Sequence, residues 1–344
     1  MNADQKKNIP GVIGVHRRSP AARLLEWYAK GHRALPWRAT SDPYAIWISE
    51  IMLQQTRAQA AIPYYERFLQ RFPTVKVLAS AEEEEVLTAW AGLGYYSRAR
   101  NVLRAAREIA AAGAFPRDYA AIRALPGIGD YTAAAVASIA FGLPHAVLDG
   151  NVMRVVARVC NDAADIGAMR TRERFREIAQ QWLEETPDRA AAFNQALMEL
   201  GATVCLPKAP LCLVCPLADV CEARAAGREN ELPVKLRKQE PVEIAEVVLV
   251  VRRGEEVLLR RRAADARHMA GFWDLPLRRE LRAREGERLG DFRHTITHHH
   301  FTFTVMGASA RPRGSEFGWF HPDRFSAIPL ATTAKKGLRA AGIL

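Results

Sequence analysis

The chain has 344 residues, of which 49 are Lys or Arg and 38 are Asp or Glu, so its formal net charge is +11. This length exceeds what most single hydrophobic cores accommodate, and we expect two domains. The positive charge favours a polyanionic partner, and no apolar run in the sequence has the length of a membrane span. The first residues lack the apolar stretch of a secretory signal, so we expect a reducing cytosol without disulfides.

Residues 20–222 carry the pattern of short helices with polar caps. Asp42 and Pro43 suit the cap and first turn of one helix, and Ser80 with Glu83 matches the capping box of another. Further helices are expected at 97–112, 131–141, 151–159, 172–184 and 190–201. No strand pattern of any length occurs here, so the sequence predicts an all-α first domain.

The composition changes after residue 222. Residues 223–241 are polar, charged and interrupted by proline, which is typical of a linker. From residue 242 onward β-branched and apolar residues form two expected strands joined at Arg253 and Gly254. We expect residues 242–344 to form an α+β domain around an antiparallel or mixed sheet.

A glycine-bearing turn, Leu125-Pro126-Gly127-Ile128-Gly129, precedes a helix of small residues. Gly127 and Gly129 permit backbone conformations that other residues resist. They also leave main-chain N–H groups uncovered at a helix start, where a phosphate can bind. The pattern over 120–141 resembles the helix–hairpin–helix of DNA repair proteins.

Two carboxylates stand in patterns that suit catalysis. Glu50 is flanked on its helix face by Ile46, Trp47 and Leu53, and apolar surroundings raise the pKa of a carboxyl group. Such a group can act as a general acid near neutral pH, although Glu50 could instead pair with an Arg or Lys. Asp149 precedes an expected helix and suits an N-cap, a position that keeps a carboxylate ionised and able to stabilise a nearby cation.

Enzymes that break glycosidic bonds usually use one protonated and one ionised carboxyl group as catalytic groups. The N-glycosidic bond of a nucleotide poses the same chemical problem, and an enzyme reaches it by flipping the base out of the duplex. Flipping needs a wedge and a stacking surface. Gln55 and Tyr95, in the segments LQQT and GLGYYSRAR, are candidates for these roles.

Four of the five cysteines, Cys205, Cys212, Cys215 and Cys221, are clustered with spacings of six, two and five residues. In a reducing compartment such a cluster indicates a metal or iron–sulfur site. Zinc would bind four thiolates tetrahedrally, but paired C-x2-C units are its commoner spacing. We expect Cys160 to be an ordinary buried residue.

The segments WISEIMLQQT, GLGYYSRARN, LPGIGDYTA and LDGNVMRV, together with the cysteine spacing, resemble the adenine DNA glycosylases of the MutY family, from Ala34 to Cys221 and more weakly beyond. The resemblance implies a base excision repair enzyme of the bacterial cytosol. Its substrate would be double-stranded DNA with adenine opposite 8-oxoguanine or guanine. The four cysteines would bind a [4Fe–4S] cluster, and the enzyme would be a monomer.

The resemblance also assigns roles. Glu50 would protonate the adenine and Asp149 would stabilise the sugar cation, with Tyr131 and Asn151 in support. Relatives that also cut the DNA backbone carry lysine at position 131, so Tyr131 predicts a monofunctional enzyme. The residues implied to contact DNA or the base are Trp37, Arg38, Gln55, Thr56, Leu93, Tyr95, Gly127 and Gly129.

The C-terminal region resembles the Nudix-like domain of the same family, with GFWDLP as its anchor. Ala283 and Arg284 align where a Nudix hydrolase needs metal-binding glutamates, so we expect 8-oxoguanine recognition and no nucleotide hydrolysis. Ile296, Thr297 and His298 replace the usual Phe-Ser-His, and the hydroxyl group and imidazole are the expected base contacts. Three consecutive histidines on a strand alternate between its faces and do not form a metal site.

The expected organisation is an N-terminal extension at 1–19, a glycosylase domain at 20–222 with the iron–sulfur loop at 205–221, a linker at 223–241 and a recognition domain at 242–344. Three alternatives remain open at this point: a non-catalytic DNA-binding scaffold, a nucleotide hydrolase and a pyrimidine-directed glycosylase. The two carboxylates argue against the first, the missing glutamates against the second, and Tyr131 and the second domain against the third.

Overall fold

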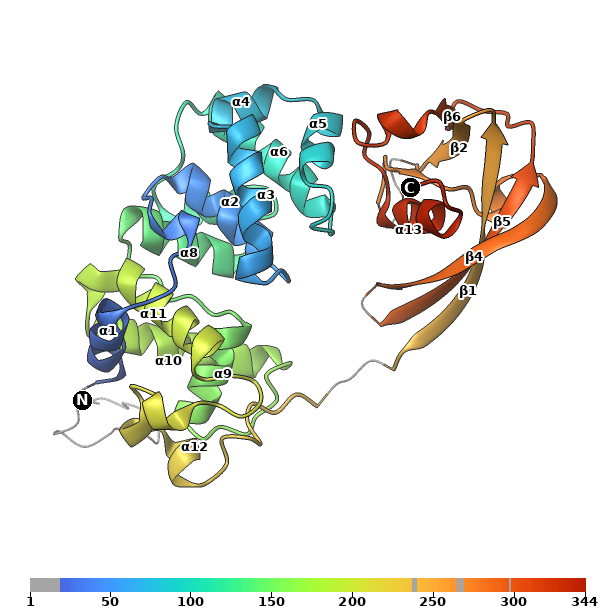
Figure 1. The fold of residues 1–344 in the computed structure, drawn as a ribbon. Helices are drawn as coiled ribbons and strands as arrows, with labels where there is room; N and C mark the ends of the chain where they lie inside the picture. The colour runs from blue at the N-terminus through green and yellow to red at the C-terminus, as the bar shows by residue number, and fades with distance from the viewer. Residues whose placement is uncertain (1–18, 237–239, 264–265, 267–268, 297) are drawn as a thin grey trace, which may run out of the picture. The chain divides into compact units, whose positions relative to one another are not determined.

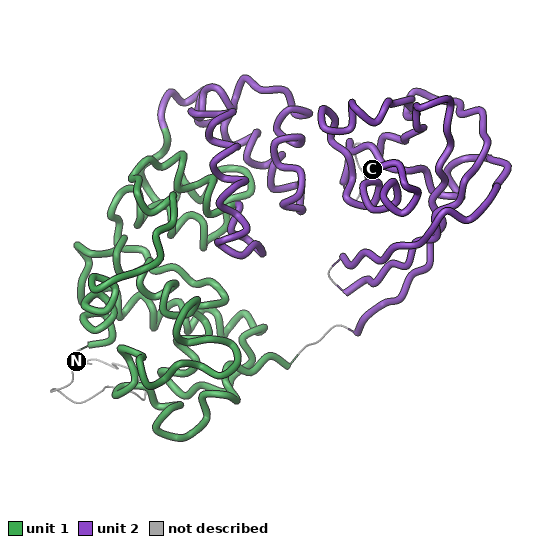
Figure 2. Tube along the Cα trace, in the orientation of Figure 1, with its two compact units in different colours: residues 1–51, 115–237 green, residues 52–114, 238–344 purple. Residues whose placement is uncertain are grey.

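The structure is a computed structural model that describes residues 19–236, 240–263, 266, 269–296 and 298–344. Two compact units make up the chain (Figure 2). Unit 1 consists of residues 1–51 and 115–237, and unit 2 of residues 52–114 and 238–344. This division differs from the domains expected from the sequence, whose boundaries stay a prediction.

All regular secondary structure in the described part of unit 1 is helical, and its core is built around Val155, Phe175, Phe193 and Leu197. Its helices are α1 (Pro20–Lys30), most of α2 (Pro43–Leu53), α7 (Tyr119–Ala124), α8 (Asp130–Phe141), α9 (Gly150–Val159), α10 (Met169–Glu184), α11 (Ala190–Thr203) and α12 (Glu222–Ala225), with short 3-10 turns at Pro36–Arg38, Pro187–Arg189, Cys212–Val214 and Ala218–Val220 (Figure 1). The predicted helices after residue 119 are therefore present, with ends that differ by three residues or fewer.

The helical part of unit 2 contains α3 (Ala58–Arg71), α4 (Val75–Ser80), α5 (Glu83–Ala89) and α6 (Ser97–Ala111). The capping box predicted for α5 is wrong in its residues. Ser80 ends α4, where its hydroxyl donates to the carbonyl of Val77 at 2.9 Å. Glu82 caps α5 instead, and the Glu85 carboxylate accepts from its backbone N–H at 3.3 Å.

The rest of unit 2 is a mixed six-stranded sheet in the order β3-β2-β1-β5-β4, with β6 paired to β2. The strands are β1 (Val242–Arg253), β2 (Glu256–Arg261), β3 (Trp273–Asp274), β4 (Arg284–Ile296), β5 (His299–Ser309) and β6 (Phe317–Phe320), and they are followed by the short 3-10 turn Pro322–Arg324 and α13 (Thr332–Ala340) (Figure 1). Strands β1 and β5 run parallel, whereas β4 and β5 form a long antiparallel hairpin.

Helix α13 packs on the sheet because Gly337 allows a close approach. A Cβ added to Gly337 would lie 2.6 Å from Leu275 and 3.3 Å from Phe292 of β4. The predicted fold class, an all-α region followed by an α+β region, is confirmed. Among the described residues, no helix combines the length and the apolar character needed to cross a bilayer.

Candidate active site

Glu50 lies on α2 with only 4% of its surface exposed. Tyr131, the second residue of α8, donates its hydroxyl to Oε2 of Glu50 at 2.6 Å. Burial and, to a smaller extent, the negative charge of Asp149 raise the pKa of Glu50, and the bond from Tyr131 lowers it; the net result is a pKa of about 7. Burial also holds the pKa of Tyr131 well above its usual value, so the phenol keeps its proton and acts as the donor.

Asp149 caps the N-terminus of α9, as its position in the sequence predicted. Its Oδ1 accepts from the backbone N–H of Val152 at 2.7 Å, and its Oδ2 accepts from the amide of Asn151 at 2.8 Å. Burial raises the pKa of Asp149, and these two bonds act against that increase because they favour the ionised carboxylate.

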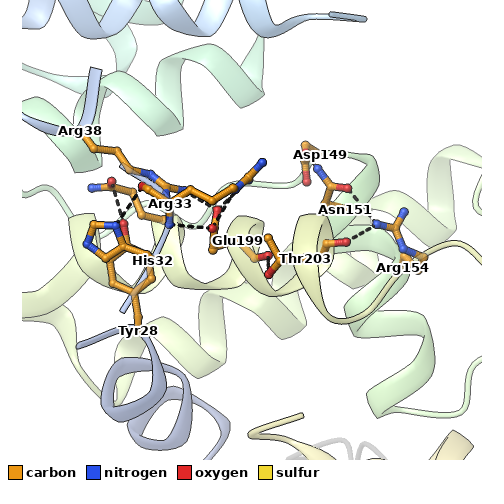
Figure 3. Close-up of polar contacts among 11 residues, drawn as sticks. Tyr28, His32, Arg33, Arg38, Asp149, Asn151, Arg154, Glu199 and Thr203 are labelled. Carbon is orange, nitrogen blue, oxygen red and sulfur yellow. Dashed lines mark hydrogen bonds and ion pairs between the residues drawn. The ribbon is translucent and has the colours of Figure 1, made fainter. Parts of the chain in front are cut away.

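A buried arginine fixes the orientation of Asn151 (Figure 3). Arg154 donates to Oδ1 of Asn151 at 2.8 Å, to the carbonyl of Gly201 at 2.6 Å and to the carbonyl of Cys205 at 2.7 Å. The guanidinium group therefore joins α9, the end of α11 and the start of the cysteine segment. Helices α9 and α11 meet closely here, since a Cβ on Gly201 would lie 2.6 Å from Cβ of Asn151.

A second cluster of charged groups was not predicted from the sequence. Glu199 of α11 is 2% exposed and accepts from Arg33 at 2.8 and 2.7 Å and from Arg38 at 2.7 Å (Figure 3). Burial raises the pKa of Glu199, but the bonds from the two arginines outweigh this effect and lower it to about 2. Trp37, beside Arg38 in the 3-10 turn, is buried.

The only sequence signal for Glu199 is a single acidic residue in the apolar helix segment ALMELG. Its partner Arg33 lies 166 positions away, so no local pattern joins them. Because the positive charge of Arg38 lowers the pKa of Glu50, this second cluster acts electrostatically on the first. The site thus combines a carboxyl group that holds a proton near neutral pH, a capped carboxylate and a fixed guanidinium group.

The predicted hairpin joins α7 to α8. Gly127 has a φ of 76°, a left-handed conformation that glycine adopts without strain. Gly129 precedes Asp130 at the start of α8, and a Cβ added there would meet nothing within 4 Å. The main chain at this helix start is therefore open, as a phosphate-binding turn requires.

Two loops in unit 2 carry four of the residues predicted to contact DNA, namely Gln55, Thr56, Leu93 and Tyr95, and each loop contains one residue with a strained backbone. Gln55 has a φ of 60° and Tyr95 a φ of 48°, in the left-handed region where residues other than glycine are uncommon. Tyr95 is 46% exposed and Gln55 is also exposed, whereas Leu93 is buried. Thr56, next to Gln55, is partly buried.

Arg98 of α6 holds the two loops together. It donates to the carbonyl of Gln54 at 2.6 Å and to the carbonyls of Leu93 and Gly94 at 3.2 Å. Its guanidinium group also lies 5.2 Å from the centre of the Tyr95 ring, within the range of a cation–π contact. These contacts offset the cost of the left-handed conformations.

The predicted recognition loop lies between β4 and β5. Ile296 ends β4 and His298 lies in the turn, while Thr297 falls outside the described residues. The ring of His298 lies 4.0 Å from that of His299. His300 pairs with Glu243 of β1 at 2.8 Å, so the three histidines do not converge on one point.

The four predicted ligand cysteines line a single pocket. Arg158, buried beside them, donates to the Cys205 sulfur at 3.2 Å and to the carbonyl of Leu206 at 2.6 Å. Within the described part of the chain, no group of three His, Cys, Asp or Glu side chains is arranged to hold a metal ion. Cys160 is partly buried, and burial raises the pKa of its thiol to about 12, as expected for an inert residue.

Comparison with known proteins gives the family. Residues 48–181 match the HhH-GPD superfamily of base excision DNA repair proteins. The human adenine DNA glycosylase is 33% identical over 401 aligned residues, which cover 92% of this chain and 72% of that protein. The mouse adenine DNA glycosylase is 45% identical over 222 residues, covering 61% of this chain and 43% of that protein.

Among solved structures, a thermostable thymine-DNA glycosylase superposes with a TM-score of 0.53 and 28% identity, covering 60% of this chain and 95% of that one. An endonuclease III in a non-covalent complex with DNA superposes with a TM-score of 0.50 at 21% identity, and so shares the fold. The extent of the match to the human protein decides the assignment: this chain belongs to the adenine DNA glycosylases, helix–hairpin–helix enzymes of base excision DNA repair.

Proposed function

We propose that the protein hydrolyses the N-glycosidic bond of adenine opposite 8-oxoguanine, or opposite guanine, in duplex DNA. The observation that carries this proposal is the buried carboxyl group of Glu50, whose pKa of about 7 keeps a proton available at neutral pH. Tyr131 occupies Oε2, so Oε1 is the atom that gives the proton to the flipped adenine.

Protonation makes adenine a better leaving group, and the bond to the sugar then breaks with positive charge developing on the ring. The carboxylate of Asp149, held by Val152 and Asn151, stabilises that charge. Water completes the hydrolysis. The Glu199 cluster fixes Arg38, whose positive charge acts on Glu50.

We further propose that the enzyme is monofunctional, because Tyr131 offers no amine for a Schiff base with the sugar. Borohydride trapping on DNA containing the mispair tests this point. The unaltered protein should give only background covalent complex, and Tyr131→Lys, which restores an amine at this position, should give more. Efficient trapping by the unaltered protein contradicts the proposal.

The four cysteines support a [4Fe–4S] cluster, which would have a structural role in holding the loop 205–221 and its Lys208 for contact with phosphate. The four cysteines line one pocket. Their 6-2-5 spacing lacks the paired C-x2-C units that are commoner at zinc sites, which favours an iron–sulfur cluster. Anaerobically purified protein should be brown with about four iron atoms per chain, and a colourless protein with one zinc would overturn this assignment.

We assign recognition of the oxidised guanine to residues 242–344, through Thr297 and His298, and probing of its strand to Gln55 and Tyr95. The exposed, strained conformations of the last two residues support that role. We also propose that the enzyme acts as a monomer.

A single-turnover assay on duplexes with adenine opposite 8-oxoguanine, guanine or thymine tests the main proposal. Adenine release should be fastest opposite 8-oxoguanine and slowest opposite thymine. Glu50→Gln should bind the same duplexes while losing at least the 10²–10⁴-fold that general acid catalysis typically contributes, about 3–5 kcal/mol. The matched control is Glu108→Gln, an exposed position on α6, which should keep its rate. Substantial adenine release by Glu50→Gln would refute the assignment.

A further inference from the structure

An open pocket lies where the β4–β5 hairpin meets the rest of its domain, at the opposite end from the turn at residue 297. We call it the arginine pocket. Its lining consists of Arg282, Ala283, Arg284, Ser309, Ala310 and Arg311. The small side chains of three of these residues leave the space above the two strands to the guanidinium groups.

The positive charges of the arginine pocket are not neutralised by the described part of the chain. Arg282, Arg284 and Arg311 are exposed and form no ion pair with any described residue. Some other arginines of residues 242–344 form ion pairs: Arg253 with Glu256, Arg260 with Glu280, Arg262 with Asp274, Arg278 with Glu285, Arg279 with Glu246 and Arg288 with Asp291. Others are exposed and form no ion pair with a described residue: Arg252, Arg293, Arg313, Arg324 and Arg339. The pocket is distinguished by three such guanidinium groups that line one hollow, which makes it a local excess of positive charge.

The end of the β4–β5 ladder brings these charges together. Arg284 pairs with Ser309 in the last pair of the ladder. Arg282 and Arg311 lie two residues beyond that pair, outside the strands, and line the same pocket. Like charges gathered in one place repel one another, and an anion between the guanidinium groups turns that repulsion into attraction.

The chemistry of the pocket selects the anion. All three cations are arginines, whose planar groups bind phosphate oxygens through paired hydrogen bonds. The pocket is open and lined by small residues, so a phosphate carried on a long polymer can reach it. We propose that the arginine pocket binds a backbone phosphate of duplex DNA, away from the base that is excised. The inference rests on the proposed function only in taking DNA as the substrate.

The pocket lies far from the predicted recognition turn. Strand β4 spans thirteen residues from Arg284 to Ile296, and at about 3.3 Å per residue the pocket lies roughly 40 Å from that turn. A duplex covers that distance in about 12 base pairs, so a duplex of about 30 base pairs is long enough to reach both.

The test compares two triple variants of the full-length protein with equal changes in charge. The first changes all three pocket arginines to Gln. The control changes Arg253, Arg279 and Arg288 to Gln, since these residues are exposed but already paired. The quantity measured is the slope of log K against log[KCl] for an undamaged duplex of about 30 base pairs. Circular dichroism verifies that both variants fold.

The slope of the pocket variant should decrease by about one, for the one phosphate that it no longer binds, and the control should keep its slope. An unchanged slope for the pocket variant, or an equal decrease in the control, overturns the inference. Because undamaged DNA is used, this outcome is independent of adenine release, and failure of the proposed function would appear in the glycosylase assay alone.

Discussion

The bond from Tyr131 to Glu50 makes a quantitative prediction about pH. The phenol donates to the carboxylate at 2.6 Å, so it stabilises the charged form and lowers the pKa of Glu50 against the effect of burial. Tyr131→Phe removes that stabilisation. A hydrogen bond to a charged group contributes about 1.5–3 kcal/mol, and one pKa unit corresponds to about 1.4 kcal/mol. The pKa of Glu50 should therefore rise by about 1–2 units.

The consequence can be measured in the pH dependence of single-turnover adenine release. A general acid is lost as pH rises through its pKa. The alkaline limb, expected near pH 7 in the unaltered protein, should move upward by about 1–2 units in Tyr131→Phe. Tyr119→Phe, the same change on α7 at a hydroxyl that makes no hydrogen bond to Glu50, should leave the limb in place. An alkaline limb that stays fixed or moves to lower pH in Tyr131→Phe refutes the reasoning.

Two further predictions use matched pairs. Gly201→Ala should lower the rate of adenine release and destabilise the protein by about 1–3 kcal/mol, because the added Cβ would lie 2.6 Å from Cβ of Asn151. The control Gly150→Ala should change little, since a Cβ there meets nothing within 4 Å. Equal rates for the two variants in a single-turnover assay would contradict this prediction. Arg98→Gln should lower the ratio of adenine release rates opposite 8-oxoguanine and opposite guanine, because it releases the loops that carry Gln55 and Tyr95. The control Arg107→Gln, on the same helix, should keep that ratio, since Arg107 donates to the carbonyls of Ala79 and Ala81 instead. Equal ratios in the two variants would argue against this role of Arg98.

Glu50 and Asp149 could be proposed as catalytic residues because each stands in an informative local setting. Glu50 is the only carboxylate of α2, and an acidic group among apolar neighbours is buried or paired. The same signal at Glu199 in α11 was overlooked. Asp149 stands where a helix cap is expected, and the turn before Tyr131 fixes where α8 begins. Short-range rules of helix formation were enough to single out Glu50 and Asp149, whereas the role of Tyr131 was implied by the resemblance to the MutY family. The structure brings Tyr131 to Glu50, and Asp149 close enough for its charge to act on both.

The rest depends on contacts between distant segments. The Glu199 cluster and the bond from Arg154 to the Cys205 carbonyl join residues 166 and 51 positions apart, and no periodicity records such pairs. The parallel pairing of β1 with β5 has the same cause, since strand composition does not specify the partner. The error at Ser80 was local: its hydroxyl bonds back into α4, an alternative always open to serine.

The bonds around Asn151 have a direction. Its oxygen accepts from a cationic donor, Arg154, so its nitrogen must face Asp149, which can only accept while ionised. Aspartate at position 151 would set two acceptors against each other, and a hydroxyl side chain would be too short to span both neighbours. The side chain of Asn151 thus passes positive polarity from the buried guanidinium group of Arg154 to the carboxylate of Asp149, without bringing a second net charge next to that carboxylate.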